Sequence, residues 1–123
     1  MAPGATPAAG LPIGRIRARR DFLAANSGVR VPTASFILLV KPRADGAPRA
    51  GFTVSRKVGN AVVRNRARRR LREVARLAMA DSAIPAADHV FIARPEARER
   101  PFADLLADTR RALARAAERL ATG

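Results

Sequence analysis

The segment that decides the fold runs from residue 50 to residue 79 and reads AGFTVSRKVGNAVVRNRARRRLREVARLAM. It opens with a short stretch, Ala50–Ser55, in which large apolar residues alternate with small or polar ones, as in a half-buried strand. Gly59 and Asn60 interrupt that pattern, and Asn60 is a residue type that caps helices. The remainder, Ala61–Met79, repeats its apolar residues at helical spacing. The segment therefore predicts a strand followed by a long helix.

The helix predicted over residues 61–79 has one apolar face and one cationic face. At about 100° per residue, one stripe collects Val63, Ala67, Leu71, Val74, Leu77 and Ala78. The opposite arc collects Arg64, Asn65, Arg68, Arg69, Arg72 and Arg76. Arginines four residues apart on a helix repel one another by roughly a few tenths of a kcal/mol per pair. Such a face makes physical sense if a polyanion neutralises it, so we predict that it binds one.

Composition agrees with a polyanionic partner. The 123 residues include 24 basic and 10 acidic side chains, for a formal net charge of +14. Residues 41–76 alone carry a net charge of +10, whereas residues 77–123 balance to zero. Hydrophobic residues make up 48% of the chain, enough for the core of one domain, and no apolar run approaches the roughly 18 residues of a membrane span. The absence of cysteine and the single histidine argue against a disulfide framework, a thiolate metal site and a histidine-based active site.

The rest of the chain predicts one α+β domain around this segment. Residues 1–14 are rich in Ala, Pro and Gly and are predicted to be a disordered tail, and residues 15–121 form the domain. Four further elements are expected: a helix over Arg15–Ala25, strands over Ser35–Val40 and His89–Ala93, and a helix that opens at Pro101. Residues 43–49 are typical of a hairpin connection. The strand–helix–strand unit in the middle indicates a helix-covered sheet rather than a helix bundle.

RNA is the polyanion that the pattern favours. A helix-turn-helix DNA reader needs a second helix packed directly before the recognition helix, but residues 50–55 have the pattern of a strand. A membrane-surface helix needs a free apolar face, which the core requires here. RNA recognised by its shape and phosphates is therefore the favoured ligand. A structural protein of the ribosome and a DNA-architectural protein remain as alternatives.

No group of residues predicts an active site in the protein. Glu73 stands alone among arginines, and we interpret it as an ion-pair partner of a neighbouring arginine. We interpret Asp104 and Asp108 as part of a solvated helix face rather than as a metal pair, and His89 as a turn or surface residue. Clustered carboxylates or a histidine base are what a protein nuclease needs. We therefore expect no catalytic residue and no metal ligand.

The run from Phe52 to Arg66, FTVSRKVGNAVVRNR, resembles the signature of the bacterial ribonuclease P protein subunit. Its continuation, Ala67–Arg76, is similar to the basic helix of that family. The pair Asp21 and Phe22 and the stretch FIARP at Phe91–Pro95 are similar as well. The resemblance extends from about Arg15 to Leu120.

This resemblance implies a small two-layer α/β sandwich in the order helix, three strands, helix, strand and helix. It also implies an uncommon left-handed crossover around the basic helix. A third strand before that helix would come from dividing residues 31–40 or 50–57 differently. The implied function is that of the ribonuclease P subunit that assists a catalytic RNA in removing the 5′ leader of precursor tRNA. Its partners would be that RNA and precursor tRNA, and it would act in the cytoplasm as a monomer within the holoenzyme, with no membrane. No cofactor is expected on the protein alone, and Mg²⁺ is expected in the RNA-containing holoenzyme, where the RNA would carry the chemistry.

Matching positions imply two sets of binding residues. The residues expected to bind RNA are Arg56, Lys57, Asn60, Arg64, Asn65, Arg66, Arg68, Arg69 and Arg72. The residues expected to line a cleft for the single-stranded leader are Phe22, Phe36, Leu39 and Val54. Asn26 and Leu39 occupy positions where the family often has an aromatic residue. We therefore expect base stacking to contribute less to leader binding here, and van der Waals contact and charge to contribute more.

Overall fold

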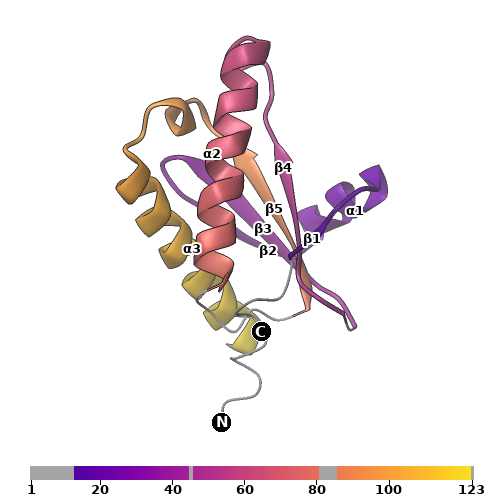
Figure 1. Cartoon of the computed structure of the whole chain (residues 1–123). Helices are drawn as coiled ribbons and strands as arrows, with labels where there is room; N and C mark the ends of the chain where they lie inside the picture. Colours follow the sequence, from indigo (N-terminus) through magenta and orange to yellow (C-terminus); the bar gives the residue numbers. More distant parts are fainter. Residues whose placement is uncertain (1–12, 45, 81–85, 123) are drawn as a thin grey trace.

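A five-stranded sheet lies at the centre of the domain, and helices pack on both of its faces (Figure 1). The computed structural model describes residues 13–44, 46–80 and 86–122. The strands in these ranges are β1 (Gly14–Arg15), β2 (Val29–Pro32), β3 (Phe36–Pro42), β4 (Arg49–Thr53) and β5 (Ala87–Ala93). The helices are α1 (Arg19–Ala24), α2 (Ala61–Ala80) and α3 (Phe102–Thr122), with 3-10 turns at Ala25–Ser27 and Pro95–Arg98. The predicted α+β class is confirmed.

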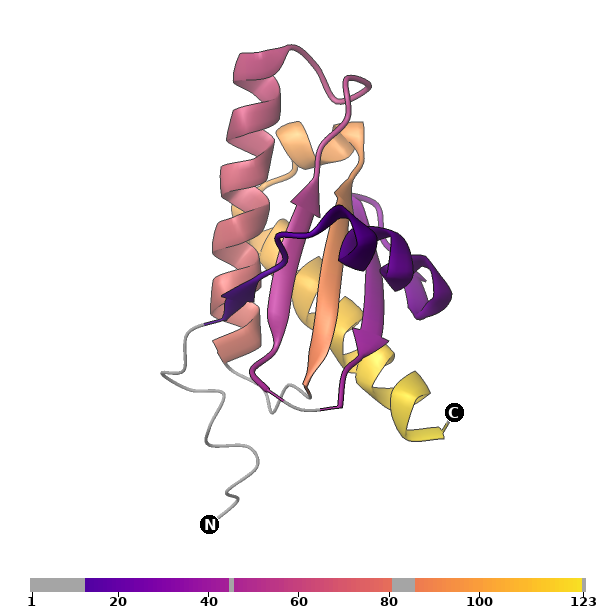
Figure 2. The same ribbon diagram turned by 90° about the vertical axis from the view of Figure 1, so that its right-hand side faces the viewer.

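The strands are ordered β1-β4-β5-β3-β2 across the sheet. β1, β4 and β5 run parallel, whereas β3 runs antiparallel to β5 and β2 antiparallel to β3. In Figure 2, β4 and β5 both point upward, β5 lies to the right of β4, and α2 lies behind the sheet. The β4–α2–β5 crossover is therefore left-handed, as the resemblance implied and against the usual preference for right-handed connections.

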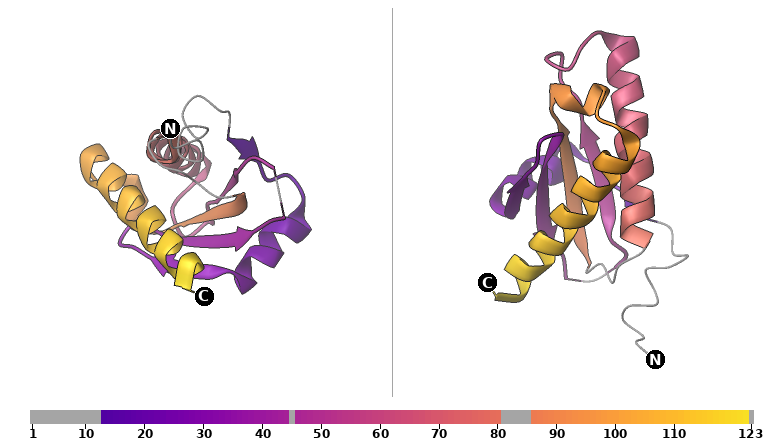
Figure 3. Two further views of the ribbon diagram at one scale, coloured as in Figure 1. Left: turned by 90° about the horizontal axis from the view of Figure 1, so that it is seen from below. Right: turned by 90° about the vertical axis from the view of Figure 1, so that its left-hand side faces the viewer.

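The two faces of the sheet bury different groups of side chains, because successive residues of a strand point to opposite sides. Phe36 and Leu38 of β3 point toward α2 and α3 and pack with Phe91 in the main core. Leu39 and Val90 point to the other face, where they form a smaller cluster beneath α1. Figure 3 shows α2 and α3 together on one side of the strands and α1 on the other.

Local signals define the start of α2. Gly59 has a φ of +155°, and a Cβ there would lie 2.7 Å from the Val63 side chain, so the turn needs glycine. The Oδ1 atom of Asn60 accepts a hydrogen bond from the backbone N–H of Val63 at 3.0 Å, which caps the helix as predicted. The buried stripe of the helix consists of Ala67, Leu71, Val74, Ala75, Ala78 and Met79.

The N-terminal part of the domain differs from its prediction. The helix expected over Arg15–Ala25 begins only at Arg19, because Gly14 and Arg15 instead form the edge strand β1 beside β4. Residues 13 and 14, which were assigned to the tail, thus belong to the domain, and residues 1–12 lie outside the described residues.

The predicted hairpin at residues 43–49 is wrong. β5 lies between β3 and β4, so the two strands joined by this turn are not paired with each other. The structure also contains the third strand before α2 that the resemblance implied. It is β2, which begins before the range proposed for it, and it pairs antiparallel with β3 through residues 37–40.

Candidate nucleic-acid interface

The outer side of α2 and the turn before it carry the predicted basic residues. We call this set the α2 cationic face: Arg56, Lys57, Asn60, Arg64, Asn65, Arg66, Arg68, Arg69 and Arg72. Arg56 and Lys57 are exposed in the turn, and Arg66, Arg69 and Arg72 are exposed on the helix. All nine residues therefore lie at the surface of the domain, on α2 and on the turn that precedes it.

The cations of this face have no acidic partners among the described residues. Arg64 donates a hydrogen bond to the carbonyl oxygen of Gly59 at 3.0 Å, and Arg68 donates one to Oδ1 of Asn65 at 2.9 Å. In the part of the chain that the structure describes, no carboxylate forms an ion pair with any of its seven arginine and lysine side chains. The positive charge of the α2 cationic face is thus left uncompensated by the protein.

Two other arginines of α2 are engaged within the protein. Arg70 donates hydrogen bonds to the carbonyl oxygens of Ala97, at 2.6 Å, and Arg100. Burial, and then the positive charge of Arg66, lowers the pKa of Arg70. Arg76 pairs with Glu73 at 2.5 Å, which confirms the interpretation of Glu73 and lowers its pKa through that hydrogen bond.

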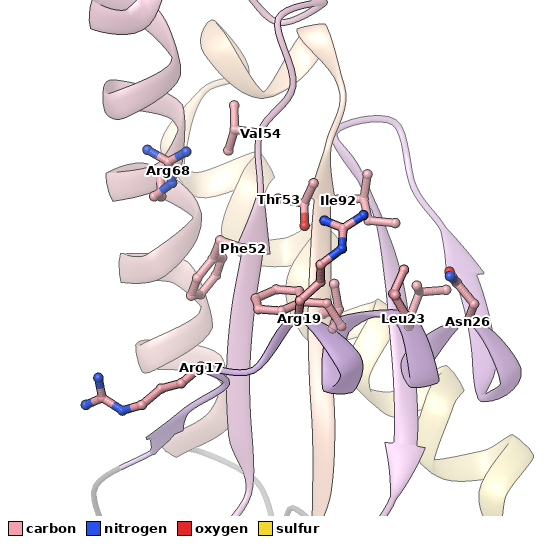
Figure 4. A pocket seen from close by; sticks show the side chains of 12 residues that line it. Arg17, Arg19, Leu23, Asn26, Phe52, Thr53, Val54, Arg68 and Ile92 are labelled. Atoms are coloured by element: carbon pink, nitrogen blue, oxygen red, sulfur yellow. The ribbon is translucent and has the colours of Figure 1, made fainter.

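A cleft of about 570 Å³ lies between α1, the sheet and α2 (Figure 4). It is lined by Arg17, Arg19, Phe22, Leu23, Asn26, Leu39, Phe52, Thr53, Val54, Arg68, Val90 and Ile92. We call it the α1 cleft. Three of the four residues predicted for a leader cleft, Phe22, Leu39 and Val54, line it.

Phe36 does not reach the α1 cleft, so its predicted place in the lining is corrected. Its side chain is fully buried on the other face of the sheet, where its ring centroid lies 5.3 Å from that of Phe91. The reason is strand alternation: Phe36 and Leu39 are three positions apart in β3 and therefore point to opposite faces.

A second hollow, of about 640 Å³, was not predicted from the sequence. It lies between β1, β4 and α2 and shares Phe22, Phe52 and Arg68 with the α1 cleft. In it the guanidinium of Arg72 lies 5.8 Å from the centre of the Phe52 ring, which stacks in turn on Phe91. The α2 cationic face and the α1 cleft therefore meet at Phe52 and Arg68.

Two contacts position α1 against the sheet. Gly51 leaves space for the ring of Phe22, because a Cβ at residue 51 would lie 2.6 Å from two of the ring carbons. Asp21 lies 3.3 Å from a guanidinium nitrogen of Arg49, and Arg49 also forms hydrogen bonds of 2.7 and 2.6 Å with Asp88. The hydrogen bond with Asp88 raises the pKa of Arg49. This chain of contacts links α1 to β4 and β5.

The prediction that His89 is a turn or surface residue is wrong. Its side chain is 2% exposed in β5, and its Nδ1 lies 3.3 Å from the carbonyl oxygen of Arg49. Burial lowers the pKa of His89, which favours the neutral imidazole. Its position in the core leaves it no access to a substrate.

Asp108 also differs from its prediction, whereas Asp104 is exposed as expected. Asp108 is 3% exposed and accepts hydrogen bonds from Arg100 at 2.5 and 3.1 Å, from Arg111 at 2.6 Å and from Ser35 at 3.3 Å. A buried carboxylate on a helix needs such hydrogen-bond donors to offset the free-energy cost of its desolvation. Asp108 thus joins α3 to the start of β3.

The donor set does not suit a protein-held metal ion. Within residues 13–44, 46–80 and 86–122, no three His, Asp or Glu side chains are grouped so as to ligate one. The buried carboxylates Asp88 and Asp108 already accept hydrogen bonds from arginines. Among the described helices, none has the length and apolarity to span a bilayer.

Comparisons with known proteins agree with the geometry. A family model described as Ribonuclease P matches residues 13–117. The ribonuclease P protein component of Ruegeria pomeroyi is 46% identical over 117 residues, covering 92% of this chain and 94% of that protein. The one from Erythrobacter litoralis is 45% identical over 103 residues, covering 84% and 85%.

Solved structures show the same likeness. The RNase P protein of Staphylococcus aureus superposes with a TM-score of 0.73 at 29% identity, covering 85% of this chain and 96% of that one. The RNase P protein from Thermotoga maritima superposes with a TM-score of 0.71 at 31% identity, covering 82% and 96%. These matches do not support the alternative of a structural protein of the ribosome.

Proposed function

The chain belongs to the ribonuclease P protein family, and on that premise we propose that it binds two RNAs with two adjoining surfaces. The α2 cationic face would bind the catalytic RNA subunit, and the α1 cleft would bind the single-stranded 5′ leader of precursor tRNA. The observation that carries the proposal is a row of seven cations without acidic partners that ends at an apolar cleft. Both surfaces are complete in one copy of the chain, so one copy per holoenzyme is sufficient.

Electrostatics supports the first half of the proposal. The cations of the α2 cationic face repel one another in the absence of a ligand, and RNA phosphates remove that repulsion. If about six of them contact phosphates, the logarithm of the affinity should fall against the logarithm of the salt concentration with a slope of roughly −4 to −5. A protein of net charge +14 also reduces the repulsion between the catalytic RNA and its RNA substrate.

The composition of the α1 cleft supports the second half. Its lining combines the aromatic rings of Phe22 and Phe52 with aliphatic side chains and has arginines at its edges. Proteins hold single-stranded nucleic acids by this combination of flat apolar surface for bases and positive charge for the backbone. Mature tRNA lacks the leader, so a leader contact would favour binding of substrate over product.

The proposal assigns phosphodiester cleavage to the RNA subunit and the Mg²⁺ ions bound there. The described residues support this assignment because they offer neither a carboxylate cluster nor an exposed histidine. The role of the protein is then to bind and orient its two RNA ligands.

Reconstitution tests the proposal. Adding the protein to a bacterial ribonuclease P RNA at low Mg²⁺ concentration should restore cleavage of precursor tRNA. The double variant Arg66→Glu/Arg69→Glu should bind the RNA subunit about a hundredfold more weakly, because two phosphate contacts become repulsive. Both side chains are exposed, so the variant should fold normally by circular dichroism.

The matched control is Arg20→Glu/Arg115→Glu, which makes the same change in net charge at two exposed positions outside both hollows. It should bind the RNA subunit within about threefold of the unmodified protein, since general electrostatic attraction alone would change. Equal losses in the two double variants would show that net charge, rather than the α2 cationic face, is responsible for binding.

A further inference from the structure

Helix α1 directs a defined set of side chains into the α1 cleft. Asp21 points to Arg49 at the sheet, and the exposed residues Arg19, Leu23 and Asn26 line the cleft. Their spacing of four and then three residues places them on one side of a helical turn. The cleft-facing side of α1 and of the 3-10 turn that follows it thus carries one cation, one aliphatic side chain and one amide.

The position of that cation is fixed by the packing of the residues next to it. Phe22 rests against Gly51, and Asp21 is tied through Arg49 to the buried carboxylate of Asp88. These contacts set the rotation of α1 about its own axis, and with it the direction in which Arg19 leaves the helix. Contacts within the protein therefore hold this wall of the cleft in place without a ligand.

Arg19 extends over the floor of the α1 cleft. Figure 4 shows its guanidinium directed toward Thr53 and Ile92, across the cleft from Arg68 of α2, whereas Arg17 points away from the floor. Among the residues that the structure describes, none accepts a hydrogen bond from the Arg19 guanidinium or pairs with it. A cation above an apolar floor, with no partner in the protein, is suited to a backbone phosphate of a strand whose bases rest on that floor.

We propose that Arg19 binds a leader phosphate and is a determinant of the preference for precursor over mature tRNA. The proposal rests on the leader-binding function proposed for the α1 cleft. Arg19 and Arg68 would hold the backbone of one strand from opposite walls, with the bases between them. Mature tRNA has no phosphate at that place, so Arg19 contributes only to substrate binding.

The test compares Arg19→Gln with Arg20→Gln in the reconstituted holoenzyme. The two residues are neighbours on α1 and both are exposed, but Arg20 lines neither hollow. Arg19→Gln should lower the ratio of precursor to mature tRNA affinity by about five- to tenfold, the effect of one lost phosphate contact. The slope of log affinity against log salt concentration should also become less steep by about 0.7 for precursor tRNA. The same slope for mature tRNA should stay unchanged. Arg20→Gln should change neither.

Two further arms separate the possible outcomes. Phe22→Ala should lower the affinity ratio without changing the salt slope, because it removes packing and no charge. A leader with an uncharged methylphosphonate linkage at the contacted position should bind unmodified protein and Arg19→Gln equally well. If Arg19→Gln and Arg20→Gln behave alike while unmodified protein prefers precursor tRNA, the role of Arg19 is refuted and the leader cleft stands. If unmodified protein shows no preference, both proposals fail.

Discussion

The arginines of the α2 cationic face and those that contact Asp88 and Asp108 are the same residue type in two opposite situations. On α2, side chains such as Arg66 and Arg69 extend into solvent without an acidic partner. Elsewhere, Arg49 and Arg100 each form two hydrogen bonds with a buried carboxylate. The difference shows that the number of arginines alone does not indicate a nucleic-acid surface, and that a group of neighbouring arginines without acidic partners among the described residues is the better indicator.

Asp88 pairs with Arg43 and Arg49 of the strongly basic segment, and Asp108 pairs with Arg100 and Arg111. Asp88 and Asp108 neutralise arginines inside the domain, so they connect elements rather than receive a ligand. A buried carboxylate is retained only where donors replace its lost water. The two groups of arginines should therefore respond differently to substitution: one should alter stability and the other affinity.

The largest effect is expected from Asp108→Ala. Removing one partner of a buried ion pair costs about 3–5 kcal/mol, and we expect about 3 kcal/mol because Arg111 can reach solvent. Denaturant unfolding measures this loss. Asp104→Ala, four residues earlier on α3 and exposed, should change the free energy of unfolding by less than about 0.5 kcal/mol. Equal losses for the two variants would contradict the distinction between paired and solvated carboxylates.

A smaller effect should separate two arginines of α2 itself. Within the described part of the chain, Arg72 has no acidic partner and lies over Phe52, whereas Arg76 is paired with Glu73. Arg72→Gln should weaken binding of the RNA subunit by about fivefold, the value of one phosphate contact. Arg76→Gln makes the same change in formal charge but should weaken binding by less than about twofold, because Glu73 already offsets that cation. Filter binding at fixed salt concentration compares the two variants, and the reverse order would refute the role of pairing.

The smallest effect concerns the pH dependence of stability. Burial lowers the pKa of His89 in the folded protein, so the unfolded chain takes up its proton first as the pH falls through about 6.5. The free energy of unfolding should therefore decrease by about 1 kcal/mol between about pH 7.5 and pH 5.5. In His89→Asn this decrease should be absent, whatever the stability of the variant at neutral pH. A slope of equal size in both proteins would assign it to other groups.

Sequence patterns predicted those features whose causes are local. The helix predicted over Ala61–Met79 is observed over Ala61–Ala80, because its apolar period and the Asn60 cap lie within a few residues of each other. The α2 cationic face follows from the same period. Of the residues that the family resemblance implied for a leader cleft, Phe22, Leu39 and Val54 line the α1 cleft.

Features that depend on distant partners were beyond these patterns. Turn residues at 43–49 indicate a change of direction but not which strands pair, so the insertion of β5 between β3 and β4 was missed. The burial of His89 and of Asp108 depends on Arg49 and Ser35, which lie 40 and 73 residues away in the sequence. The strand β1 has two residues, too few to show any periodicity.

Arg68 lines both hollows. This shared position determines which phenotypes its mutations should produce. Under the proposed function, a substitution there would be pleiotropic, since it would disturb both the proposed contact with the catalytic RNA and the proposed contact with the leader. Restoring activity to such an allele would require compensating mutations in both RNA ligands. Alleles at Arg69, which is exposed on α2, and at Arg19, which lines the α1 cleft, would instead separate the two proposed functions, assembly of the holoenzyme and choice of substrate.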